Sequence, residues 1–169
     1  MKTSVFLICV FILTGLLNNC KKESETATLD CRVVSNTLCR EIILDLNNGS
    51  NTINRNESWI FFTYDNSTKT LKISHKNAGF NCCPGTFSVE VTNQGNCLTI
   101  DEKEELPGCH CLCLYDIDLE IYNVQPTSYK LKILELYIGD HNPLVGIIDL
   151  KNCTAGSFYI VRDFYPWGI

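Results

Sequence analysis

The chain contains 169 residues, of which 45% are hydrophobic and 20% are charged, and its formal net charge at pH 7 is −5. This hydrophobic content, with aromatic residues spread along the chain, is enough for a core and excludes a disordered spacer. The acidic balance and the lack of a clustered basic segment argue against a nucleic-acid partner. The length is that of one domain with short additions.

The N-terminal residues 1–19 have the pattern of an export signal. Lys2 is followed by the apolar run Val5–Leu17, which is shorter than the roughly 20 residues of a membrane-spanning helix. The run ends at Leu17-Asn18-Asn19-Cys20, which resembles the lipobox of bacterial lipoproteins, although Asn19 stands where that family prefers Gly, Ala or Ser. The resemblance implies removal of residues 1–19 and lipidation of Cys20. Cleavage by an ordinary signal peptidase is the alternative, but no small-x-small tripeptide supports it.

Residues 20–28 are polar and charged, so we expect a flexible tether between the anchor and the domain. Their start, Cys20-Lys21-Lys22-Glu23, resembles the charged export tag of surface lipoproteins in the Bacteroidota group, and a plain solvated linker is the alternative. No Asp follows Cys20, so the usual cue for retention in the inner membrane is missing. The predicted location is the outer membrane or cell surface, with a periplasm-facing position left open. The predicted membrane contact is the lipid anchor.

From residue 29 onward, short segments with alternating apolar side chains are separated by Asn, Gly and Pro clusters. The expected strands lie, in chain order, at 41–46, 59–64, 71–73, 86–92, 98–100, 111–122, 129–137, 146–150 and 157–162. A turn at Asn93–Asn96 predicts a hairpin between residues 86 and 100. No helical periodicity is present. The pattern predicts an all-β domain over 29–169, a single antiparallel β-sandwich of immunoglobulin- or fibronectin-like or related Greek-key form.

Two details concern the later strands. The segment Ile117–Val124, the corner Gln125–Ser128 and the following Tyr129-Lys130-Leu131-Lys132-Ile133 resemble consecutive strands of fibronectin-type and other bacterial sandwich domains. The apolar phase then slips, because Tyr129, Leu131 and Ile133 share one face whereas Leu134, Leu136 and Ile138 share the other. We expect either a bulge near Ile133–Leu134 or a strand that is buried on both faces.

Cysteines carry most of the remaining information. The chain has 11 of them, and Cys9 lies in the signal while Cys20 is assigned to the lipid. The candidates for disulfides are the other nine, Cys31, Cys39, Cys82, Cys83, Cys97, Cys109, Cys111, Cys113 and Cys153. Export to an oxidising compartment favours a disulfide framework. Nine is an odd number, so at least one thiol is free, metal-bound or paired between molecules.

Cys109, Cys111 and Cys113 alternate in phase with Tyr115, which places all three on the core-facing side of one long strand. Neighbours two apart along a strand have Cα atoms about 6.5–7 Å apart, at the upper limit for a direct disulfide. Each therefore needs a partner elsewhere. The candidate partners are Cys82, Cys83 and Cys97. We expect two or three bridges between the two regions, without a deducible pairing.

A thiolate metal site is the competing hypothesis for the same region. Its ligands would be Cys82, Cys83, Cys109, Cys111 and Cys113, with zinc or copper(I) as the soft metal. A Cys-x-Cys strand separates its sulfurs and sends His110 to the opposite face, which favours disulfides. No Cys-x-x-Cys is present, so a thioredoxin-type enzyme is not expected. The Cys-Cys-Pro-Gly and Cys-x-Cys-x-Cys segments behind a lipoprotein signal resemble uncharacterised small lipoproteins of the Bacteroidota group.

No catalytic motif is recognisable, and no cofactor is expected. We interpret His75, His110 and His141 as surface or loop residues, Asp116, Asp118 and Glu120 as a solvated strand face, and Asp101, Glu102, Glu104 and Glu105 as a loop cluster. Trp59, Phe61 and Tyr64 are expected to pack in the core, and the terminal Phe164–Trp167 to dock on the domain or to offer an exposed ring. The predicted function is a non-enzymatic, disulfide-stabilised binding module with a protein or glycan partner.

Overall fold

A computed structural model describes residues 25–39, 53–105, 108–139 and 141–162, and these form ten strands and no helix. The strands are β1 Thr26–Leu29, β2 Cys31–Asn36, β3 Glu57–Asp65, β4 Thr70–Asn81, β5 Phe87–Gln94, β6 Cys97–Glu104, β7 Leu112–Ile121, β8 Ser128–Leu134, β9 Leu144–Asp149 and β10 Ala155–Val161. The predictions for Cys20, for a strand at 41–46 and for Phe164–Trp167 lie outside the described residues.

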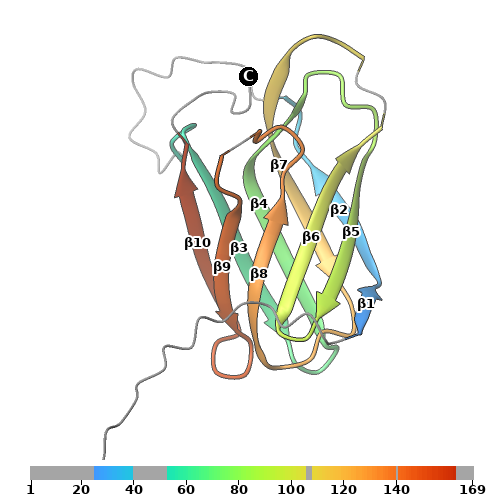
Figure 1. The fold of residues 1–169 in the computed structure, drawn as a ribbon, viewed down its shortest axis with the longest axis vertical. Coiled ribbons are helices and arrows are strands. Elements are labelled where there is room, and N and C mark those ends of the chain that lie inside the picture. The colour runs from blue at the N-terminus through green and yellow to red at the C-terminus, as the bar shows by residue number, and fades with distance from the viewer. Residues whose placement is uncertain (1–24, 40–52, 106–107, 140, 163–169) are drawn as a thin grey trace, which may run out of the picture.

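The strands form two sheets of five, which lie face to face in two layers (Figure 1). The first sheet has the order β1-β5-β6-β8-β9, and the second sheet has the order β10-β3-β4-β7-β2. The all-β class is confirmed. The expectation of purely antiparallel pairing is wrong for one pair, because β6 and β8 run parallel. The chain leaves the first sheet after β6, forms β7 in the second sheet, and returns as β8 in the direction of β6.

Alternation of apolar and polar residues explains where the core lies. In β3, Ile60, Phe62 and Tyr64 are buried, while Trp59 and Phe61, which alternate with them, point to the outer face of the second sheet. The first sheet contributes the matching inner residues, such as Leu98 and Ile100 from β6 and Leu131 and Ile133 from β8. Side chains from both sheets therefore form one continuous core.

An aromatic group and two buried hydrogen bonds stabilise different parts of this core. Phe80, Phe87 and Tyr115 meet edge to face, with ring centroids 4.7, 5.1 and 6.3 Å apart. The buried Tyr64 hydroxyl donates a hydrogen bond to the carbonyl oxygen of Val124 at 2.8 Å. The buried Tyr115 hydroxyl likewise donates to the carbonyl oxygen of Asn81 at 3.0 Å, so both hydroxyls have the partner that burial requires.

The hairpin expected between residues 86 and 100 is present as β5 and β6, and Gly95 in its turn has a φ of 61°. The bulge expected near Ile133–Leu134 is wrong, because β8 ends at Leu134. The apolar residue Leu136 that suggested a second buried face is half exposed beyond that end. The change of phase in the apolar pattern after Ile133 therefore reflects the end of β8 and not a bulge.

The segment expected as a tether contains the start of the fold. β1 begins at Thr26 and pairs antiparallel with β5, with Thr26 opposite Gln94 and Leu29 opposite Val91. Residues 26–28 are mostly exposed, which explains why their side chains gave no strand signal. Their order comes from backbone pairing, so the boundary predicted at residue 29 is too late.

Candidate functional site

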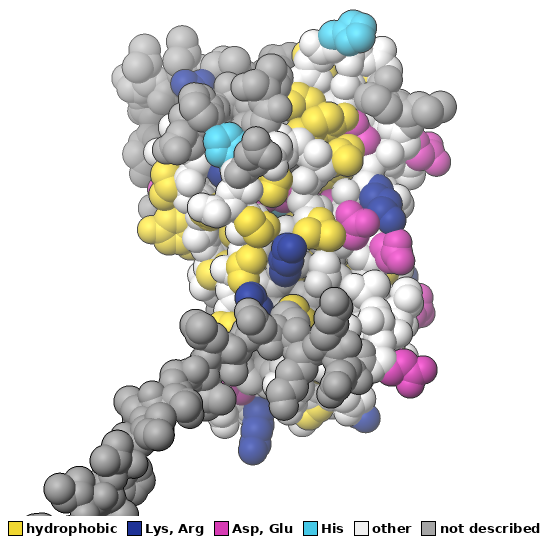
Figure 2. All heavy atoms as spheres, in the orientation of Figure 1, with side chains coloured by type: hydrophobic (Ala, Val, Ile, Leu, Met, Phe, Trp, Pro, Cys, Tyr) yellow, Lys and Arg dark blue, Asp and Glu magenta, His cyan; other side chains and the backbone are white. Residues whose placement is uncertain are grey.

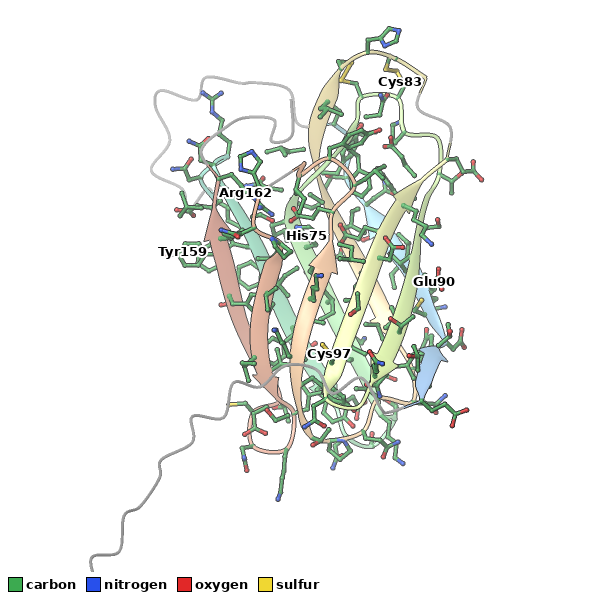
Figure 3. All side chains as sticks on the ribbon, in the orientation of Figure 1. His75, Cys83, Glu90, Cys97, Tyr159 and Arg162 are labelled. Carbon is green, nitrogen blue, oxygen red and sulfur yellow. A yellow bond between two sulfur atoms is a disulfide. The ribbon has the colours of Figure 1, made fainter. Side chains whose placement is uncertain are left out.

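Four cysteines meet at one end of the fold, and we call this cluster the cysteine tip: Cys82, Cys83, Cys109 and Cys111. Cys82 is bridged to Cys111 and Cys83 to Cys109, with Cα–Cα distances of 5.5 and 5.8 Å. The Sγ atoms of Cys109 and Cys111 lie 3.7 Å apart, so the two bridges are immediate neighbours. Figure 3 shows Cys83 at the end of the molecule opposite Cys97.

Asn81 holds the two arms of the cysteine tip together. Its side-chain amide donates to the carbonyl oxygen of Cys109 at 2.5 Å, and its side-chain oxygen accepts from the backbone N–H of Cys83 at 2.8 Å. The backbone N–H of Gly108 also donates to the carbonyl oxygen of Cys83 at 3.1 Å. The expected cross-links between the two cysteine regions are thus present, two in number, and are supported by hydrogen bonds.

The register predicted for Cys109, Cys111 and Cys113 is wrong. β7 begins only at Leu112, so Cys109 and Cys111 lie in the bend before the strand, and Cys111 is exposed. Cys113 alone is on the strand and buried, and it is bridged to Cys39 with a Cα–Cα distance of 5.6 Å. The three cysteines therefore lie in two different environments, a bend and a buried strand. Before Leu112, the spacing of two residues does not reflect a strand.

The remaining cysteines separate into bonded and free. Cys97, at the start of β6, is disulfide-bonded, whereas Cys31 and Cys153 are free. Burial raises the pKa of the Cys31 thiol against the lowering effect of a backbone hydrogen bond, and Cys153 is exposed. Within the described ranges, no group of three or more His, Cys, Asp or Glu side chains is arranged to hold a metal ion.

A buried polar network crosses the interior between the sheets. His75 on β4 contacts the hydroxyl of Ser58 through Nε2 and the carboxylate of Glu102 through Nδ1, both at 2.8 Å. Beside it, Glu135 forms an ion pair with Arg162. Figure 3 shows His75 and Arg162 close to each other near the same end of the strands. Each of these five side chains is buried.

The order Ser58–His75–Glu102 is the hydrogen-bond order of an acyl-transfer triad, so its accessibility decides its role. Ser58 and His75 are 0% exposed and Glu102 is 1% exposed, so no substrate reaches the serine oxygen in this structure. The network contains two carboxylates, one guanidinium and one imidazole, whose charges balance when His75 is protonated. We conclude that it is a charge-balanced structural network.

Two interpretations from the sequence are corrected by this network. His75 is a buried core residue, because it faces inward in phase with Leu71 and Ile73 on β4. Glu102 is not in a loop but on β6, in phase with the buried Leu98 and Ile100. The alternation of apolar residues in the sequence places both His75 and Glu102 on the core side. They were not assigned to the core because ionisable residues are ordinarily found at the surface.

Stability is expected to fall as the pH rises through the folded-state pKa of His75. Burial lowers the pKa of His75, but the charge and hydrogen bond of Glu102 and the charge of Glu135 outweigh it, so the net shift is upward. A raised folded pKa gives stabilisation that is complete below the unfolded value of about 6.5 and is lost above the folded value. The raised pKa of the Glu135 carboxyl, caused by burial, acts in the same direction.

Urea midpoints measured between about pH 5.5 and 9 test this expectation. The variant His75→Gln, which lacks the titrating ring, should show a flatter pH dependence at lower overall stability. A stability of the unaltered chain that is constant across this range, or equal slopes in both proteins, would contradict the role assigned to His75.

On the outer face of the second sheet, three aromatic side chains form a group that we call the aromatic cluster: Trp59, Phe61 and Tyr159. The Trp59 ring lies 4.2 Å from Tyr159 and 5.6 Å from Phe61, with interplanar angles of 14° and 11°. The indole N–H of Trp59 donates to a Glu57 carboxylate oxygen at 2.9 Å. Tyr159 is 51% exposed and Phe61 is 38% exposed, so large ring surfaces remain open to solvent.

A groove of about 260 Å³ begins at Phe61 and crosses the same face. Strand register explains its lining: Phe61 lies opposite Ser74, which lies opposite Asp118, and Thr63 lies opposite Lys72, which lies opposite Glu120. Val34, half exposed at the bulge of β2, lines the far part. The groove therefore has an apolar end at the aromatic cluster and a mostly apolar lining, along which lie the polar groups of Lys72, Ser74, Asp118 and Glu120.

The charged groups of this groove hold one another in place. Glu120 accepts hydrogen bonds from Arg32 at 2.7 Å and Tyr122 at 2.8 Å and pairs with Lys72 at 3.2 Å. These contacts, led by the bond from Arg32, lower the pKa of Glu120 to about 2. Asp118 accepts from the hydroxyls of Ser35 and Ser74, both at 2.6 Å. The outward direction predicted for Asp118 and Glu120 is right, but they form an ordered network. The prediction of a solvated face is wrong for Asp116, which is buried and pairs with Lys76.

Trp59 and Phe61 were expected in the core, and the structure places them outside it. They are out of phase with Ile60 and Phe62, and the four consecutive apolar residues 59–62 leave no sequence signal for which pair faces the core. Tyr159 belongs to a segment a hundred residues later and reaches Trp59 only because β10 pairs with β3. The aromatic cluster is therefore a product of tertiary structure.

Comparisons of the chain with protein-family models, with curated proteins and with solved structures found no match. Across the described ranges, no helix has the length and hydrophobicity that crossing a bilayer requires. The site must therefore be interpreted from its own chemistry.

Proposed function

We propose that the protein is an extracytoplasmic lipoprotein, anchored through Cys20, whose β-domain is a non-enzymatic module that binds glycan chains on the outer face of the second sheet. Three disulfides, which persist in oxidising compartments, support the location. The exposed aromatic cluster at the end of a groove with polar groups along it supports the binding role. We also propose that the two layers are an immunoglobulin-like or related Greek-key β-sandwich.

Sugar rings match this face because they have apolar C–H surfaces and hydroxyl groups around their edges. An exposed aromatic ring such as Phe61 can pack against the C–H surface. Pre-ordered acceptors and donors, here Asp118, Glu120 and Lys72, can bind the hydroxyls. The groove lining is mostly apolar, as an aromatic or aliphatic contact requires, and the polar groups of Lys72, Asp118 and Glu120 along it are what favours a glycan over a purely apolar protein surface.

Calorimetric titration with defined hexasaccharides of glucose, xylose and mannose tests the binding proposal. Phe61→Ala is expected to weaken binding of the best ligand about tenfold, the loss of one aromatic contact. Leu136→Ala is the matched control, because Leu136 is a 50% exposed apolar residue away from the groove. Equal effects of the two substitutions, or binding of no oligosaccharide, would refute the glycan proposal. The anchor is tested separately by cell fractionation, in which Cys20→Ser should remove the chain from the outer-membrane fraction.

Soft-metal binding by thiolates remains the second candidate function, and the neighbouring sulfurs of Cys109 and Cys111 favour it. Reduction of both bridges would give the cysteine tip four neighbouring thiols, which is the number of ligands that zinc prefers. Alkylation under denaturing conditions without reductant, with metal analysis of the native protein, separates the two. The expected result is no bound metal and protection of the seven described cysteines that are disulfide-bonded, Cys39, Cys82, Cys83, Cys97, Cys109, Cys111 and Cys113. Free thiols at the cysteine tip with bound zinc or copper would favour the metal function.

A further inference from the structure

The edge strands on the two sides of the fold differ in the features that prevent pairing with another chain. On one side, β1 has four residues, and β2 has a register shift between Val33 and Ser35 and an Arg32 that pairs with Glu120. Short length, bulges and charges are the devices that prevent an edge strand from pairing with another chain. The opposite side ends in β9 and β10, and β10 has none of these devices.

β10 reads Ala-Gly-Ser-Phe-Tyr-Ile-Val, with no charged residue and no proline. It pairs with β3 over all seven residues without a register shift. Its outward side chains Tyr159 and Val161 are 51% and 60% exposed, and Ile147 on the neighbouring β9 is 69% exposed. Figure 3 shows Tyr159 projecting beyond β10, and Figure 2 shows acidic side chains gathered on the other side, along β5 and β1.

The order of residues in β10 makes the strand complementary to itself. Small outward residues, Ala155 and Ser157, occupy its first half, and large ones, Tyr159 and Val161, occupy its second half. Antiparallel pairing of two copies about a two-fold axis at Phe158 places Tyr159 opposite Ser157 and Val161 opposite Ala155. Each large side chain then meets a small one, and no like charges oppose each other.

We propose that β10 is a homodimer interface, at which two copies of the chain join their second sheets into one sheet of ten strands. A two-fold axis perpendicular to the sheet keeps the outer face of both copies on the same side. The aromatic clusters of the two protomers then flank the axis on one continuous surface. Gly156 is compatible with this interface but does not argue for it, because packing within one chain already requires a glycine there. A Cβ at this position would lie 2.8 Å from the Phe62 ring of the same chain.

Two double variants of the full chain test both the interface and its register. Ala155→Lys with Val161→Lys places lysine opposite lysine twice across the axis and should raise the dimer dissociation constant at least about tenfold. Ala155→Glu with Val161→Lys places opposite charges together and should retain the dimer. Within one chain, Val161 lies opposite Glu57, so the lysine common to both variants is tolerated by the protomer.

Sedimentation velocity of the chain in a density-matched detergent gives the mass of each protein, and thermal unfolding verifies that each is folded. The expected result is a dimer for the unaltered chain and the Glu/Lys variant and a monomer for the Lys/Lys variant. A monomer at about 100 µM for the unaltered chain would overturn the proposal. The proposal would also be overturned if both variants dimerised equally or if both dissociated equally. In either case Ala155 would not lie opposite Val161 of the second copy.

Discussion

Replacing Glu135 with leucine is expected to lower the free energy of unfolding by about 3–5 kcal/mol, the usual effect of leaving a buried charge without its partner. Glu135 forms an ion pair with Arg162, and both side chains are about 2% exposed. A guanidinium does not lose its proton in a protein, so Arg162 must keep its charge in the interior. Urea unfolding at pH 7 gives the loss directly.

The reverse substitution provides the control. Arg162→Met should cost less than Glu135→Leu, because a buried carboxyl can neutralise itself by binding a proton, and burial already raises the pKa of Glu135. The double variant with both substitutions should recover most of the stability, since a packed apolar pair often replaces a buried ion pair without loss. If the double variant is as unstable as Glu135→Leu alone, the pair is not the source of the effect.

Removing the bridge between Cys39 and Cys113 is expected to cost about 4.5 kcal/mol, because it closes a loop with a sequence separation of 74 residues. The effect arises in the unfolded chain, whose conformational entropy rises when the loop is opened. Cys113 is also buried, so the alanine variant loses core contacts as well. Unfolding of the Cys39→Ala, Cys113→Ala double variant measures this loss.

The bridge between Cys83 and Cys109 is the matched comparison, with a sequence separation of 26 residues. Its removal should cost about 3.5 kcal/mol at most, because the loop is shorter and the Cys82–Cys111 bridge still holds the same two segments. A larger loss at the cysteine tip than at Cys113 would contradict the loop-entropy account.

Much of the fold was accessible from the sequence, for reasons visible in single strands. The clean alternation of Phe87 with Val91 and the turn at Gly95 predicted the β5–β6 hairpin, since pattern and turn chemistry agree there. Pairing between distant strands was not accessible. Nothing in the residues of β8 indicates that it runs parallel to β6, because strand direction is set by the connection through the other sheet.

The site was less predictable than the fold. His75 and Glu102 each lie in phase with core residues, but their partnership depends on β4 and β6 facing each other from opposite sheets. Spacing alone placed Cys109 and Cys111 on a strand that begins only at Leu112. The correct part, cross-links between the two cysteine regions, rested on the count of cysteines and on their compartment, neither of which requires a register.

The cysteine tip and β1 lie toward opposite ends of the molecule (Figure 1). A chain held at the membrane through Cys20, as we propose, would present the cysteine tip as its most distant part. That is where proteases from the surroundings would make first contact, and exposed loops are their usual point of attack. With two adjacent bridges, a cut between residues 83 and 109 would leave both fragments covalently joined, so the outermost end of the molecule would survive nicking.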